Sequence, residues 1–318
     1  MPLKYAILPD INIREYETMA TKAKPSSKAR SAKTTRPASG AAARTTKKPT
    51  AVKAKAAVAQ STAAKKTYRF TDDLSGTQVL GEMLGTFLLV SLVAATGGNA
   101  FLVGIGYIAI VLMFFSASGA QVNPAVTFGL WAMRKLSTAK MLFYWMAQFV
   151  GAIAAILVMN AFASSKFEIS LASFTQWNWA VVSAEVFGAA IFMFVVAAVL
   201  HRGNSDTDKA VGMGIGLFVA LLVSSAMLQQ AVTTASSGAT EGSEAPRITK
   251  LNGTTVNPAV ALSLKETDNS NVNPLTGEQE SEAKTTASRL TVETIVGTLV
   301  GAALGGRLFM LFARSTRD

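Results

Sequence analysis

Two asparagines in identical surroundings are the residues of this chain whose type and spacing suggest chemistry. The four residues Asn123-Pro124-Ala125-Val126 return as Asn257-Pro258-Ala259-Val260. Asparagine is a favoured helix N-cap and proline a favoured first helical residue. Each copy therefore predicts the start of a helix, with the positive end of the helix dipole at the asparagine.

Both predicted helices are too short to cross a bilayer, because their apolar runs end at Arg134-Lys135 and at Lys265-Glu266. About ten residues, at ~1.5 Å each, cover only half of a ~30 Å hydrocarbon core. Irregular backbone before such a half-helix is tolerated at membrane depth only where it is buried in protein or lines a cavity. Two half-helices that meet at mid-membrane indicate a pore or a binding site.

Six apolar runs of nearly membrane-spanning length must position these motifs. They lie near 79–95, 100–115, 140–162, 179–200, 211–228 and 291–313. Each half holds three spans and one re-entrant segment, and because three is odd, the halves must be inverted relative to each other. The sequence predicts an all-α membrane protein with six transmembrane helices plus two re-entrant half-helices in an inverted repeat, with repeat 1 at about 74–162 and repeat 2 at about 179–313.

Further residues recur between the halves. Glu82 of the first span is matched by Glu185 of the fourth, and Gly-Ile-Gly occurs at 104–106 and at 214–216. Repeat 2 carries two polar insertions, roughly 229–250 and 265–289. Their composition is typical of disordered loops, and the alternative is a lid over the outer mouth that brings Arg247 or Lys250 to the pore.

Composition separates a basic tail from the apolar remainder. The chain is 50% hydrophobic, and residues 1–70 hold 16 Lys or Arg against 3 acidic residues, whereas the rest holds 14 against 16. The tail cannot bury a core, so we predict a disordered cytoplasmic segment that contacts anionic lipid, followed by a channel domain at 71–318. A nucleic-acid-binding arm and an organellar transit peptide are the ranked alternatives, and Met19 is an alternative start. The positive-inside rule places both termini in the cytoplasm.

Residues needed for several kinds of active site are missing. The chain has no Cys, which excludes disulfides, thiol catalysis and Cys-ligated metal, and its single histidine, His201, falls in a short polar loop. We expect no catalysis, no metal and no cofactor.

From about Leu80 to Phe312 the chain resembles the aquaporin, or major intrinsic protein, family. The resemblance is carried by residues 82–87 (EMLGTF), 118–127 (SGAQVNPAVT), 147–152 (AQFVGA), 253–259 (GTTVNPA) and 296–303 (VGTLVGAA). It implies a narrow pore at whose centre both half-helices meet, with four protomers per assembly. Asn123 and Asn257 would then turn amide donors to passing water or hydroxyl groups. Pro124, Ala125, Pro258 and Ala259 complete the pore centre. Glu82 and Glu185 would accept hydrogen bonds from the re-entrant backbone, and the alternative for these carboxylates is a proton relay.

The family's narrowest point falls on Val103, Val223, Thr254 and Val260 when counted from the motifs. Water-selective members usually carry an arginine at the position of Val260. Loss of that cation predicts an apolar and wider ring that passes water together with a neutral solute such as glycerol or urea.

The resemblance implies a channel for passive transport of water and small neutral solutes. A proton-coupled secondary transporter and a nonconducting membrane scaffold with a partner-binding tail are the rival interpretations. The sequence leaves open which solute is physiological and which membrane holds the protein.

Overall fold

The computed structural model describes residues 73–164, 167–202, 205–238, 246–266 and 287–315. These segments belong to one compact unit within residues 61–318. The predictions for the basic tail and for the start at Met19 lie outside the described residues. So does most of the second polar insertion.

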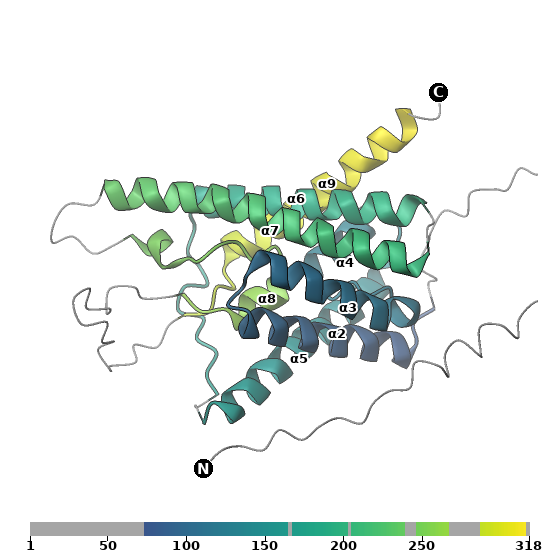
Figure 1. The fold of residues 1–318 in the computed structure, drawn as a ribbon, viewed down its shortest axis with the longest axis horizontal. Coiled ribbons are helices and arrows are strands. Elements are labelled where there is room, and N and C mark those ends of the chain that lie inside the picture. The colour runs from purple at the N-terminus through teal and green to yellow at the C-terminus, as the bar shows by residue number, and fades with distance from the viewer. Residues whose placement is uncertain (1–72, 165–166, 203–204, 239–245, 267–286, 316–318) are drawn as a thin grey trace, which may run out of the picture. The chain divides into compact units, whose positions relative to one another are not determined.

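Six long helices dominate the described part of the chain. They are α2 (Gly76–Ala95), α3 (Ala100–Ser118), α5 (Thr138–Phe162), α6 (Trp179–Arg202), α7 (Asp206–Ser237) and α9 (Val292–Ser315). All six are long and apolar enough to cross a membrane, which confirms the predicted number of spans. Figure 1 shows α6 and α7 lying side by side along much of their length.

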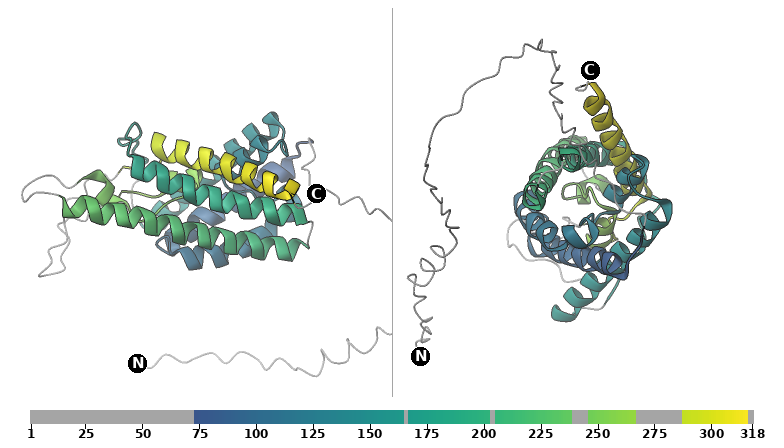
Figure 2. Two further views of the ribbon diagram at one scale, coloured as in Figure 1. Left: turned by 90° about the horizontal axis from the view of Figure 1, so that it is seen from above. Right: turned by 90° about the vertical axis from the view of Figure 1, so that its right-hand side faces the viewer.

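Two short helices stand at the repeated motifs. Helix α4 (Pro124–Ala132) has nine residues and α8 (Pro258–Ser263) has six, so both are half-helices. The order of two long helices, one short helix and one long helix occurs twice. In the end-on view the long helices form a ring, and α8 with its preceding loop lies inside it (Figure 2). The all-α inverted repeat predicted from the sequence is the observed architecture.

Glycines at equivalent places allow the helices to approach closely. A Cβ built on Gly151 of α5 would lie 2.2 Å from the Met83 carbonyl oxygen, and one on Gly301 of α9 would lie 2.3 Å from that of Val186. Where α3 crosses α7, Gly104 and Gly214 face each other's carbonyl oxygens in the same way. Small residues at such contacts are how helices associate in lipid, where hydrophobic burial gives no net gain.

Helix α7 is longer than predicted. The sequence places its end near Leu228 and a polar loop after it, but the helix continues to Ser237. The reason is tertiary packing: Leu228 and Val232, one turn apart, form a small buried cluster with Val181 of α6 and with Ile248. Ile248 belongs to the short 3₁₀ helix η1 (Arg247–Lys250), which also lies in the stretch predicted as a loop.

Candidate pore centre and its cavity

The repeated asparagines cap the two half-helices in the same way. Asn123 and Asn257 have extended backbones, with φ of −154° and −153°. The Asn123 Oδ1 accepts a hydrogen bond from the Ala125 amide at 2.8 Å, and the Asn257 Oδ1 accepts one from the Ala259 amide at 2.9 Å. The following prolines, Pro124 and Pro258, lack an N–H where a helix has no partner for one.

The same side chains also join the two halves. The Asn123 Nδ2 donates to the Val256 carbonyl at 2.9 Å, and the Asn257 Nδ2 donates to the Val122 carbonyl at 3.1 Å. Each amide group has two N–H bonds, so one donor on each asparagine is not used by these contacts. The two helix N-termini therefore meet with their asparagines in a fixed, reciprocal orientation.

Two buried carboxylates hold the loops that lead into the motifs. Glu82 accepts hydrogen bonds from the amides of Gln121 and Val122 at 3.0 and 2.7 Å. Glu185 accepts them from the amides of Thr255 and Val256, both at 2.8 Å. Both glutamates are fully buried. Each carboxylate thus satisfies two backbone donors that have no helix to join.

The loops need this support because their backbone is strained. Val122 and Val256, directly before the two asparagines, have positive φ angles of 42° and 53°. A β-branched residue rarely adopts this left-handed region, and such a conformation costs about 1–3 kcal/mol. The carboxylate contacts to these two amides offset that cost, and the carbonyl groups of the same two valines face the other half.

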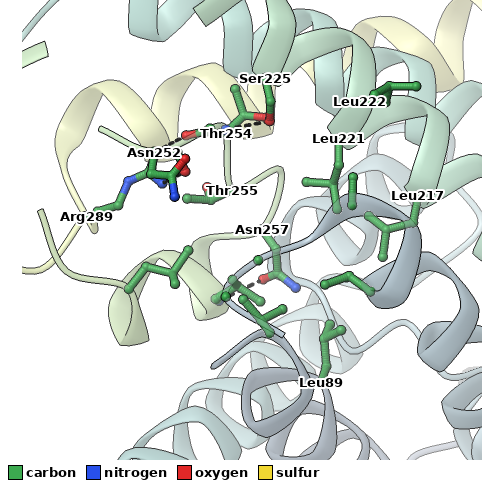
Figure 3. Close-up of a pocket in the computed structure, with 18 of the residues that line it drawn as sticks. Leu89, Leu217, Leu221, Leu222, Ser225, Asn252, Thr254, Thr255, Asn257 and Arg289 are labelled. Carbon is green, nitrogen blue, oxygen red and sulfur yellow. Dashed lines mark hydrogen bonds between the residues drawn. The ribbon is translucent and has the colours of Figure 1, made fainter. Parts of the chain in front are cut away.

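A cavity of about 620 Å³ is lined by both asparagines and by Gly97 and Gly98, where α2 joins α3. Figure 3 shows Asn257 on its wall. Val103, Thr254 and Val260 lie on its wall, as do Tyr107, Phe192 and three leucines of α7. The lining is mostly apolar, with polar groups from the loop at 252–257, from Ser225 and Gln229 of α7, and from Lys265 and Arg289. An apolar wall with a few polar groups is typical of cavities that take small molecules.

Val223 does not lie where the sequence places it. Its side chain is 39% exposed and does not line the cavity, whereas Leu217, Leu221, Leu222 and Ser225 of α7 do. Residues on a helix are separated by about 100°, so an error of one or two positions in counting turns a side chain away from the pore. The prediction for Val223 is therefore corrected to the leucine face of α7.

Thr254 already has hydrogen-bond partners. Its hydroxyl lies 2.6 Å from the Ser224 Oγ and 3.2 Å from the Ser225 Oγ, and its amide donates to the Ser225 Oγ at 3.0 Å. These contacts fix the loop before α8 against α7.

The arginine proposed as a lid residue is engaged elsewhere. The Arg247 Nε lies 2.7 Å from a carboxylate oxygen of Glu266, and its Nη1 lies 2.7 Å from one of Glu293. Neither Arg247 nor Lys250 lines the cavity. The idea that one of them enters the pore is wrong for this structure.

Arg289 is a cavity residue that the sequence analysis missed. It lies just before α9, is 4% exposed and lines the cavity beside Asn252 and Thr254 (Figure 3). Burial lowers the pKa of its guanidinium, and the nearby carboxylates of Glu185, Glu266 and Glu293 act in the opposite direction. The sequence carried one signal, which is an arginine directly before an apolar span.

Comparison with known proteins identifies a matching family and several related proteins. The family model described as Major intrinsic protein matches residues 79–237, half of the chain. A stretch of 158 residues, 45% of this chain, is 30% identical to the glycerol uptake facilitator protein-like 6 of Lactiplantibacillus plantarum and covers 72% of that protein.

Other relatives are matched over shorter parts. Aquaporin NIP2-3 of Zea mays is 29% identical over 159 residues, which make up 46% of this chain and 52% of the maize protein. Aquaporin-B of Dictyostelium discoideum is 38% identical over 96 residues, 26% of this chain and 33% of that protein. The chain thus spans about half of the maize protein and about a third of the Dictyostelium protein.

Among solved structures, the aquaglyceroporin from Plasmodium falciparum matches with a TM-score of 0.45 and 18% sequence identity, over 74% of this chain and 94% of that one. The assignment of a family rests on the sequence matches. The family model matches half of the chain, which also has six helices long and apolar enough to cross a membrane and two half-helices in an inverted repeat. The chain therefore belongs to the major intrinsic protein family.

Proposed function

We propose that this protein is a passive membrane channel for water and small neutral solutes. The observation that carries the proposal is the reciprocal pair of asparagines, each capping a half-helix and each facing the same cavity. No catalytic step and no cofactor are part of it.

The mechanism follows from the charges at the pore centre. Two helix N-termini concentrate positive potential there, which opposes the entry of cations. The free amide donors of Asn123 and Asn257 bind the oxygen of a passing water or hydroxyl group. A water held by its oxygen at both asparagines has its hydrogens turned away from the centre, so a proton cannot be relayed along the file.

The cavity wall supports passage of more than water. Val103, Val260 and the leucines of α7 offer no hydrogen bonds, so a solute contacts an apolar surface as well as the polar groups of the cavity. A glycerol- or urea-sized molecule has an apolar or flat face for the leucines and polar groups for the loop at 252–257. The glycerol facilitator named among the relatives agrees with this choice of substrate class.

The setting in the membrane is part of the same proposal. We place both termini in the cytoplasm, the basic tail on anionic lipid, and the cavity mouth on the outer side. Large apolar side chains on the long helices, such as Phe101, Met146 and Leu311, are more than half exposed and would face lipid or a neighbouring protomer of a homotetramer.

Stopped-flow swelling of proteoliposomes that contain the full chain tests the proposal. We expect water flux above that of empty vesicles, with glycerol or urea flux that does not saturate. Uptake that saturates, requires a proton gradient and fails in Glu82→Gln would instead identify a coupled transporter. Absence of any solute flux, with tail-dependent capture of a partner protein, would identify a scaffold.

A further inference from the structure

The cation that is missing at position 260 has a counterpart elsewhere on the cavity wall. Val260 is buried against the cavity and carries no donor, and the Thr254 hydroxyl is engaged by Ser224 and Ser225. Arg289 is the buried cation among the described cavity residues, and it comes from the segment before α9.

The side chain of Arg289 is fixed on the loop that precedes the second motif. Its Nη1 donates to the Asn252 carbonyl at 3.2 Å, and its Nη2 donates to the Gly253 carbonyl. A guanidinium has five N–H donors, so these two contacts leave three. The buried Nε has no hydrogen-bond partner in the described part of the chain.

The backbone around Arg289 is fixed just as firmly. Its amide donates to the Leu264 carbonyl at 2.9 Å. The Ser288 hydroxyl donates to the carbonyls of Ala261 and Leu262 at 3.1 and 3.0 Å. These are carbonyl groups at the end of α8 that have no partner within the helix. Ser288 therefore caps the end of α8, while the side chain of Arg289 donates to the loop before α8.

The carboxylates near Arg289 are paired with another arginine. Glu266 and Glu293 both bind Arg247, and Glu185 accepts from two backbone amides. Among the described residues Arg289 has carbonyl partners alone, so its charge is not cancelled by a direct ion pair. Arg247 thus binds one oxygen of Glu266 and one of Glu293.

We propose that Arg289 is the specificity-determining cation of this channel, supplied from the segment before α9 in place of residue 260. The inference rests on the proposed channel function. Across the cavity from Arg289 stand the leucines of α7 (Figure 3), so a neutral solute meets a donor on one side and an apolar surface on the other. A cation meets a like charge in a low-dielectric passage and is excluded.

Arg289→Gln in the full chain tests this role, with Arg202→Gln as its matched control. Arg202 is an exposed arginine at the end of α6 and does not line the cavity, so both variants make the same chemical change and only one makes it on the cavity wall. Water, glycerol and sodium fluxes are measured in proteoliposomes at clamped potential. We expect the ratio of sodium to water flux to rise about tenfold in Arg289→Gln and to stay unchanged in Arg202→Gln.

Arg289→Lys separates the effect of the positive charge from the effect of the hydrogen bonds that the guanidinium makes. Lysine retains the positive charge but cannot donate to two carbonyls in the fixed geometry of a guanidinium. We expect Arg289→Lys to exclude sodium and to show an altered ratio of glycerol to water flux. This variant carries the test if Arg289→Gln does not yield monodisperse protein.

A double variant, Val260→Arg with Arg289→Gln, asks whether an arginine at the motif position replaces the lost cation. We expect it to exclude sodium again. Sodium flux as low in folded Arg289→Gln as in the unaltered protein would overturn the inference, as would equal leaks in Arg289→Lys and Arg289→Gln. An unaltered protein that passes no water or solute would instead overturn the channel function itself.

Discussion

Both re-entrant loops have two buried backbone amides that need an acceptor, but the residues around these amides differ between the loops. In both, a buried glutamate binds the two amides before the motif, and a strained valine precedes the asparagine. Glu82 also accepts from the Ser118 hydroxyl at 2.7 Å and from the Gln148 Nε2 at 2.8 Å. Glu185 has one further donor among the described residues, the Thr255 hydroxyl at 3.0 Å.

The two halves also differ in the residues that surround the two buried glutamates. Gln148 lies three residues before Gly151 of α5, and the position three before Gly301 of α9 is Thr298, whose hydroxyl binds the Thr294 carbonyl of its own helix. In place of a neutral amide, the second half has charged residues, Arg247, Glu266, Arg289 and Glu293. The shared parts hold the two asparagines in place, whereas the unshared parts give the second half charged residues that the first half lacks at this place.

Replacing either buried glutamate removes contacts that both halves share, and it has the largest expected effect on the free energy of folding. Glu82→Leu and Glu185→Leu each leave two buried amides without an acceptor, at about 1–3 kcal/mol apiece, so each loses roughly 4 kcal/mol of folding free energy. Glu82→Leu should be the more destabilising, because Ser118 and Gln148 lose an acceptor as well. Thermal unfolding in detergent measures both. Equal or reversed losses would mean that the extra donors at Glu82 contribute nothing.

Asn123→Asp and Asn257→Asp test whether the two halves are equivalent at the pore centre. Aspartate cannot donate to the carbonyl of the other loop, and it places a negative charge between the helix N-termini. We expect water permeability to fall about tenfold in both variants. Asn99→Asp makes the same chemical change at the exposed N-cap of α3, outside the cavity lining, and should stay close to the unaltered protein. A large loss in one half alone would contradict the reciprocal geometry.

Removing Arg247 disturbs the second half alone. Arg247→Gln leaves Glu266 and the fully buried Glu293 without their ion pair, which we expect to cost about 2 kcal/mol because the arginine itself is partly exposed. Hydrogen exchange should quicken at 246–266 and 287–293 while residues 118–127 keep their protection. Arg202→Gln, at an exposed helix end, is the control. Faster exchange in both loops would show that the charged residues stabilise the whole fold.

Local sequence signals predicted the parts that the two halves share. Spans, half-helices and paired glutamates each depend on residues close together in the chain or on simple periodicity, and the six spans and the inverted repeat are present as predicted. The asparagine caps depend on the next two or three residues alone.

The parts that differ depend on contacts far apart in the chain. The end of α7 is set by packing of Val232 on Ile248, which no local pattern reveals. Val223 was misplaced because nothing in an apolar helix marks which face turns to the pore. Arg289 reaches the cavity because Ser288 caps α8 from 26 residues away. Its segment also lies within an insertion that repeat 1 lacks.

Gln148→Thr makes the first half resemble the second and has the smallest expected effect. The variant removes the amide that donates to Glu82 at 2.8 Å and to the Thr127 hydroxyl at 2.9 Å. Glu82 retains both backbone amides and Ser118, and the Gln148 Oε1 has no partner to lose among the described residues. We therefore expect a loss of about 1–2 kcal/mol, the value of one hydrogen bond to a charged group. Water permeability should be unchanged, because the pore centre is still built by the same two amides. Thermal unfolding and stopped-flow swelling measure the two effects on one preparation. A change in permeability without a loss of stability would mean that Gln148 acts on the pore directly, and the first half would then carry specificity as well.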